Sequence, residues 1–170
     1  MISTIEVADQ GIPLAYTFED LMRYHGPGSP GGVAHAFKVM ERVLPLLEPG
    51  GLLERREIVV ETAFAGPGAR DAFEMVTRAV TEDRYVVDAS LACPRLGPTR
   101  ERFVFRLSYR GRSVTVVLRE GYVREEFLEL ARLEGRTVEE ENRLTVLKQE
   151  MADRLLANPA TDVYDVDGQV

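Results

Sequence analysis

A glycine-rich loop that begins with a histidine is the most promising setting for chemistry in this sequence. Residues 24–32 read YHGPGSPGG and lead into a segment with helical periodicity. Glycine lets a backbone turn sharply and approach a ligand closely, and the free N–H groups at a helix start attract anions. The loop therefore predicts a site for a small molecule or an anion. Its candidate contacts are His25, Gly26, Gly28, Ser29 and Gly31.

The chain has only two histidines, and both lie near this loop. His25 stands at the start of the loop, and His35 lies about one helical turn beyond the glycines, where it could face the same space. Two imidazoles can exchange protons or bind a divalent metal, and these two are the only candidate nitrogen ligands. A structural interpretation stays open, in which the glycines allow close helix packing and each histidine is a satisfied polar group.

A second candidate group lies where a short strand meets another glycine–proline loop. The strand EIVVET ends in Glu61 and Thr62, and AFAGPGAR leads from it into a helix that contains Asp71. Strand ends are favoured ligand positions, and a carboxylate there can accept a proton or hold a metal. Glu61 and Thr62 are therefore candidate ligand-binding residues. Glu61 stays undecided between function and structure, whereas Asp71 is expected to interact with the positive end of its helix.

Hydrophobic periodicity predicts the elements that would carry these loops. Three- and four-residue apolar spacing indicates helices, and strict alternation on both sides of a glycine turn indicates a β-hairpin. A strand, a helix and a second strand in succession favour a parallel crossover. The expected elements are a short hairpin within 2–16, helices over 17–24, 33–47 and 69–80, and strands over 57–62, 85–89, 103–109 and 114–118.

Two further helices are expected after these strands. The first covers 123–134, and a capping box of Thr137 and Glu140 starts a longer one that ends near residue 157. The apolar stripe of the longer helix would pack on the chain's own core or on a second subunit, and the sequence leaves both open. Residues 1–16 are interpreted as an N-terminal extension and residues 158–170 as a C-terminal tail.

This order of elements predicts a single α+β domain over residues 1–170. Its core is an α-β-α-β-β-β arrangement with a mixed sheet, helices packed on the sheet and additional C-terminal helices. A length of 170 residues, of which 45% are hydrophobic, suits one globular core.

Composition narrows the classes of partner. The net charge of −7 argues against a nucleic-acid partner, which needs a basic face. No apolar run approaches the ~20 residues of a membrane helix. The first residues do not resemble a secretory signal, so a cytoplasmic location without membrane contact is expected. Seven arginines lie between residues 95 and 119; we interpret them as a solvated hairpin face, with an anion-binding surface as the alternative.

Three segments together resemble a known family: YHGPGSPGG, ETAFAGPGARDAFEMVT and the C-terminal LLANPATDVYDV. They are similar to the FmdE family of formylmethanofuran dehydrogenase components, over most of residues 17–166. That family shows a pattern like FHGHxCPG before its first long helix. A strand ending in Glu-Thr, a cysteine and a helix opening with Asp-Ala follow, with a threonine six residues after the aspartate. The positions that match or nearly match are Tyr24, His25, Gly26, Pro30, Gly31, Glu61, Thr62, Asp71, Ala72 and Thr77.

The departures from the family pattern concern its metal ligands. Pro27 stands where the family has a second histidine, Ser29 stands where it has a cysteine, and residues 63–68 contain no cysteine. A neutral hydroxyl is a weak ligand beside a thiolate. The family's frequent zinc ribbon also has no counterpart here. The resemblance therefore implies the fold, the location of the pocket and a degraded metal site around His25.

Three hypotheses for the function follow. The first is a cytoplasmic binding or accessory protein, which the resemblance links to molybdenum or tungsten enzymes and to a homodimer. Its pocket would lie between residues 25–35 and 61–71, and its cofactor would be at most a divalent metal. The second is a small-molecule enzyme that uses His25 as acid or base with Glu61 assisting. The third is a structural or regulatory homodimer without a ligand. The hypothesis of a binding or accessory protein is favoured over that of an enzyme.

Overall fold

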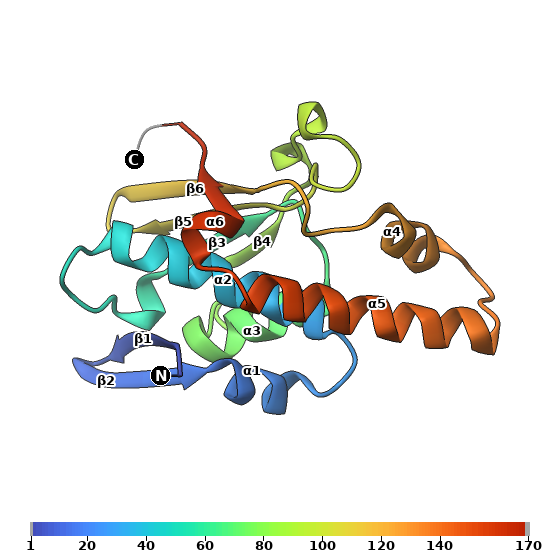
Figure 1. The fold of residues 1–170 in the computed structure, drawn as a ribbon. Helices are drawn as coiled ribbons and strands as arrows, with labels where there is room; N and C mark the ends of the chain where they lie inside the picture. Colours follow the sequence, from blue (N-terminus) through green and yellow to red (C-terminus); the bar gives the residue numbers. More distant parts are fainter. Residues whose placement is uncertain (1, 169–170) are drawn as a thin grey trace.

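Helix α2 (Pro30–Leu47) is the central element of the structure, a computed structural model that describes residues 2–168. It packs between α3 (Pro67–Thr77) and α5 (Val138–Leu156), and it also contacts the main sheet (Figure 1). Most of its residues are buried, among them Phe37 and Met40. A helix that is apolar on nearly all sides must be covered on nearly all sides, which explains this position.

The main sheet has five strands in the order β4-β3-β5-β6-β7. Strands β3 and β4 are parallel and are joined through α3, whereas the other neighbours are antiparallel. The mixed sheet, the parallel crossover and the α+β class predicted from the sequence are therefore confirmed. The strands are β3 (Val59–Thr62), β4 (Tyr85–Val87), β5 (Val104–Tyr109), β6 (Arg112–Leu118) and β7 (Tyr164–Val166).

The first residues form an antiparallel hairpin of β1 (Thr4–Asp9) and β2 (Ile12–Thr17). Ile5 and Val7 of this hairpin are buried in the core, so the segment interpreted as an extension contributes to the domain. Thr17 then caps helix α1 (Phe18–His25) in a capping box with Asp20, as its position before the helical pattern indicates.

The expectation that residues 158–170 form a tail is wrong for the part of this segment that the structure describes. Residues there form the short helix α6 (Ala160–Val163) and the edge strand β7, which pairs with β6. The Tyr164 side chain is fully buried. A strand of three residues is too short to show alternation, so periodicity alone did not reveal it.

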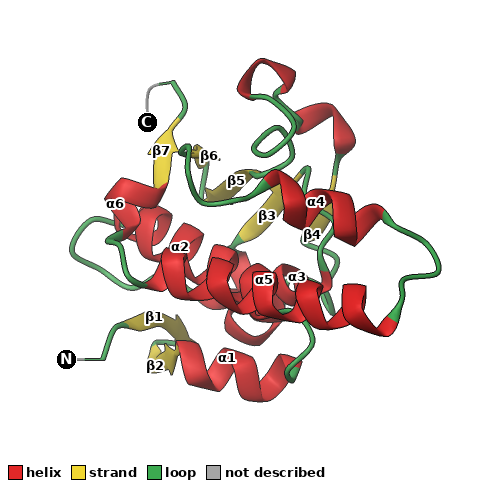
Figure 2. Cartoon of the chain, turned by 45° about the vertical axis from the view of Figure 1, so that its right-hand side comes forward, coloured by secondary structure: helices red, strands yellow, loops and turns green. Residues whose placement is uncertain are grey.

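Helices α4 (Glu125–Arg132) and α5 extend from the body of the protein as a pair (Figures 1 and 2). The predicted capping box of Thr137 and Glu140 starts α5. Helix α4 has no fully buried residue and contacts α5 more than any other element. Within residues 2–168, no helix combines the length and the apolar character needed to span a bilayer.

Candidate functional site

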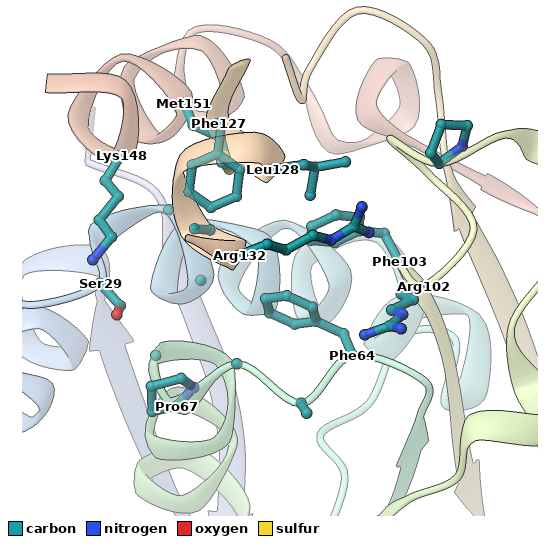
Figure 3. A pocket seen from close by; sticks show the side chains of 17 residues that line it. Ser29, Phe64, Pro67, Arg102, Phe103, Phe127, Leu128, Arg132, Lys148 and Met151 are labelled. Atoms are coloured by element: carbon teal, nitrogen blue, oxygen red, sulfur yellow. The ribbon is translucent and has the colours of Figure 1, made fainter. Parts of the chain in front are cut away.

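A cavity of about 410 Å³ lies between the starts of α2 and α3 on one side and the α4–α5 pair on the other. We call it the helix-end cavity. Ligand sites have volumes of roughly 300–1,000 Å³ and mostly apolar walls, so this cavity has the size of one. Figure 3 shows side chains from all these elements, and from the loop before β5, pointing into the same space. The walls contain Ser29, Gly31, Gly32, Phe64, Pro67, Gly68, Arg102, Phe103, Phe127, Leu128, Ala131, Arg132, Lys148 and Met151.

Two glycines allow the starts of α2 and α3 to approach each other. A Cβ atom on Gly68 would lie 2.5 Å from the Ser29 carbonyl oxygen, and one on Gly32 would lie 3.1 Å from the Ala69 nitrogen. Both neighbours are backbone atoms, which cannot move aside cheaply. The structural interpretation of the glycines, close helix packing, is therefore confirmed at this crossing. The same packing brings two helix starts to one cavity.

Aromatic rings form one wall of the helix-end cavity. Phe64 stacks on Phe103 with 4.6 Å between ring centroids, and Phe103 stacks on His35 at 4.4 Å. Thr62 fixes the start of the Phe64 segment, because its hydroxyl donates to the Val104 carbonyl and accepts the Phe64 N–H. Thr62 thus supports this wall from behind and does not line the cavity.

His35 belongs to the core and not to the space beside His25, so the expectation that both histidines share a site is wrong. Its Nδ1 lies 2.7 Å from the Tyr164 hydroxyl, and its Nε2 lies 3.2 Å from Met151 Sδ. Because sulfur can only accept here, Nε2 carries the proton and the Tyr164 hydroxyl donates to Nδ1. Burial lowers the His35 pKa to about 3 and raises the Tyr164 pKa well above 10. With both nitrogens engaged, His35 is not free to bind a metal.

His25 connects α1 to α3. Its Nδ1 lies 2.8 Å from an Asp71 carboxylate oxygen, and its side chain is 9% exposed. The Nε2 atom is buried and has no hydrogen-bond partner among the described residues. Asp71 lies beyond the first turn of α3, which holds no acidic residue, so the expectation that it interacts with the positive end of this helix is wrong. It pairs with His25 instead. His25 and Gly26 do not line the helix-end cavity, and Gly28 contributes only a carbonyl that accepts from Lys148.

Replacing His25 with alanine is expected to reduce the free energy of unfolding by about 1–3 kcal/mol, because the partly buried Asp71 loses its contact at 2.8 Å and keeps only Arg70, 3.4 Å away. Arg23→Ala provides a control on the same helix, since Arg23 is 75% exposed and its loss should change stability by less than about 0.5 kcal/mol. Urea unfolding of both variants measures the difference. Equal stabilities would show that the His25–Asp71 contact does not stabilise the fold.

Glu61 lies on the other face of the sheet from the buried side chains of Val60 and Thr62. There its carboxylate accepts two hydrogen bonds from Arg106, at 2.7 and 3.2 Å, and this contact raises the Arg106 pKa. His25 pairs with Asp71 instead, so the structure does not bring His25 and Glu61 together as an acid–base pair. Within residues 2–168, no three His, Cys, Asp or Glu side chains cluster as metal ligands do.

Six of the seven clustered arginines interact with carboxylates or a backbone carbonyl, as expected of a solvated hairpin face. Arg112 donates to the Leu47 carbonyl, and the five that pair with carboxylates are Arg95, Arg100, Arg106, Arg110 and Arg119. Arg102 instead lines the helix-end cavity, in line with the anion-binding alternative.

Sequence reasoning placed Ser29 and Gly31 at the site but missed most of its walls. Phe64, Phe103 and the residues of α4 line the cavity without belonging to any chemical motif. The available signal was the amphipathic stripe of α4, which has Phe127 and Ala131 on one face, four residues apart.

In comparisons with known proteins, no protein-family model and no curated sequence matches this chain. The resemblance to the FmdE family therefore stays a prediction from the motifs.

Proposed function

We propose that this chain is a binding protein that holds a small organic molecule in the helix-end cavity. The observation that carries the proposal is a cavity of about 410 Å³ with three phenylalanines in its walls, at the meeting point of two helix starts. Burial of an apolar ligand surface there would be favourable by about 25 cal/mol for each Å². The cavity also lies between the two loops that the sequence singled out.

The chemistry of the walls favours binding over catalysis. Among the described residues that line the cavity there is no histidine, cysteine, aspartate or glutamate. Those are the commonest general acids and bases, and Lys148 is the one side chain in the lining that could take their place. Ser29 is the one hydroxyl in the walls, and its neighbour Lys148 donates to the Gly28 carbonyl, 3.1 Å away, rather than accepting from that hydroxyl.

An accessory role beside a molybdenum or tungsten enzyme, which the family resemblance implies, is compatible with such a binding protein. In that case the bound molecule would be an organic compound used by that enzyme rather than a metal ion, because the described residues offer no cluster of metal ligands. The homodimer and the cytoplasmic location stay predictions from the sequence.

The proposal is tested with the neutral, apolar fluorophore N-phenyl-1-naphthylamine. We expect its fluorescence to rise on titration with the protein and to saturate at one site. In Ala131→Trp, an indole on α4 fills the cavity, and the affinity should fall at least about tenfold, a loss of about 1.4 kcal/mol. Ala157→Trp introduces the same ring at an exposed position outside the cavity and should bind like the wild type. No saturable binding to the wild type, or equal binding by both variants, would refute the proposal.

A further inference from the structure

The charges around the helix-end cavity point to a specific class of ligand. We propose that the cavity binds an organic anion, with its acidic group between Arg102, Arg132 and the starts of α2 and α3. The apolar body of the ligand would lie against Phe64, Phe103 and Phe127. This inference rests on the proposed function and adds the ligand's charge.

Three cations surround the cavity without a carboxylate to neutralise them. Arg102, Arg132 and Lys148 line it, and within residues 2–168 no carboxylate oxygen lies within 4.0 Å of their nitrogen atoms. The Lys148 side chain donates to the Gly28 carbonyl, 3.1 Å away, which is an uncharged acceptor. The chain has a net charge of −7, but the charged side chains that line this apolar cavity are all cations. Such a field attracts anions.

A second hollow offers a direct contrast. The open groove beside Tyr122 contains three arginines, but it also contains three carboxylates of the same chain; these residues are Arg100, Arg119, Arg154, Glu120, Asp162 and Asp165. Arg100 reaches Glu120, and Arg119 lies 3.7 Å from both Asp162 and Asp165. The positive charge of that groove is therefore balanced internally, whereas that of the helix-end cavity is not.

The backbone adds to the positive potential of the cavity. Helices α2 and α3 both start with a proline, and neither has a side-chain cap or an acidic residue in its first turn. Helices α1, α4 and α5 all have acids there. The first-turn N–H groups of a helix have no partner within the helix and carry its positive end. Gly31, Gly32 and Gly68 belong to these first turns and line the cavity.

The arrangement of the side chains indicates how such an anion would lie. In Figure 3, Arg132 extends from α4 across the cavity, and Arg102 lies on the side of Phe64 and Phe103. Lys148 lies beside Ser29. An inorganic anion would leave the phenylalanine side chains in contact with water. A neutral molecule would leave the cations without a partner. A compact organic acid would cover the apolar walls and also pair with the cations. Its charged group would form charge-assisted hydrogen bonds.

Two fluorophores that differ by one sulfonate test the inference. N-Phenyl-1-naphthylamine is neutral, and 1-anilinonaphthalene-8-sulfonate has the same rings with one negative charge. At low ionic strength we expect the sulfonate to bind the wild type at least about tenfold more tightly, and added salt to reduce this preference. The double variant Arg102→Gln/Arg132→Gln should lose most of the preference, which is the ratio of the two affinities measured in the same protein. Both arginines are exposed, so the variant should fold.

Arg95→Gln is the matched control, because it removes one exposed arginine that lies outside the cavity. It should bind both probes like the wild type. Equal affinity of the wild type for the two probes would overturn the anion inference while leaving the proposed binding function intact. Failure of the neutral probe to bind would instead contradict the proposed function. A preference for the sulfonate that persists in the double variant would also overturn the assignment to Arg102 and Arg132.

Discussion

Replacing Gly68 with alanine is expected to lower the free energy of unfolding by about 2–3 kcal/mol, because the new methyl group would overpack the crossing of α2 and α3. Its Cβ would lie 2.5 Å from the Ser29 carbonyl oxygen and 3.0 Å from the Val33 nitrogen, so the two helices must move apart. Since these helix starts also form a wall of the helix-end cavity, binding of the neutral fluorophore should weaken as well. Urea unfolding and fluorescence titration measure the two effects.

Gly28→Ala is the control for this prediction. Gly28 lies in the glycine-rich loop, has no atom within 4 Å of an added Cβ and does not need a positive φ angle. Alanine there should leave stability unchanged or raise it by up to about 1 kcal/mol, since it restricts the unfolded chain. A Gly68→Ala variant as stable as Gly28→Ala would contradict the close packing of α2 on α3.

The second large effect is a loss of stability in acid that depends on His35. Burial lowers the pKa of His35 from 6.5 to about 3 in the folded protein. Below pH 6.5 the unfolded chain binds a proton at this residue that the folded protein does not bind. The free energy of unfolding should therefore fall as the pH is lowered from 6.5 towards 3, by up to about 1.4 kcal/mol for each pH unit.

Urea unfolding at several pH values between 7.5 and 4.5 measures this slope in the wild type and in His35→Gln. The variant should be less stable at pH 7.5, because it loses the stacking on Phe103 and alters the contact with Tyr164. It should also lose stability less steeply in acid, because glutamine does not titrate. Parallel curves for the two proteins would show that His35 is not held neutral by the core.

Much of the fold could be predicted because its signals are local. The N-cap at Thr17, the capping box at Thr137 and the alternation of β5 and β6 each depend on a few neighbouring residues, and the structure has all of them. Helix α2 begins at Pro30 rather than at residue 33, since proline is well suited to a first helical position. Strand β7 was missed because three residues carry too little pattern.

The candidate site was predicted less completely because it depends on packing between distant segments. Glu61 attracted attention as a strand-end carboxylate, but the register of β3 directs it to Arg106 on the other face of the sheet. His35 lies one turn inside α2, as expected, yet the rotation of that helix turns its ring into the core. The walls from Phe127 and Arg132 come from a helix about a hundred residues away from the glycine-rich loop. No local rule connects these segments.

The location of the bound anion tests the account most directly. Two-dimensional ¹H–¹⁵N NMR spectra of the full chain, recorded with and without saturating 1-anilinonaphthalene-8-sulfonate, report it residue by residue. We predict the largest shifts at the amides of Gly31, Gly32, Gly68 and Arg132, and little change in the β1–β2 hairpin or in the open groove beside Tyr122. Shifts confined to that groove or to the hairpin, with the starts of α2 and α3 unperturbed, would contradict the assignment of the helix-end cavity as the binding site.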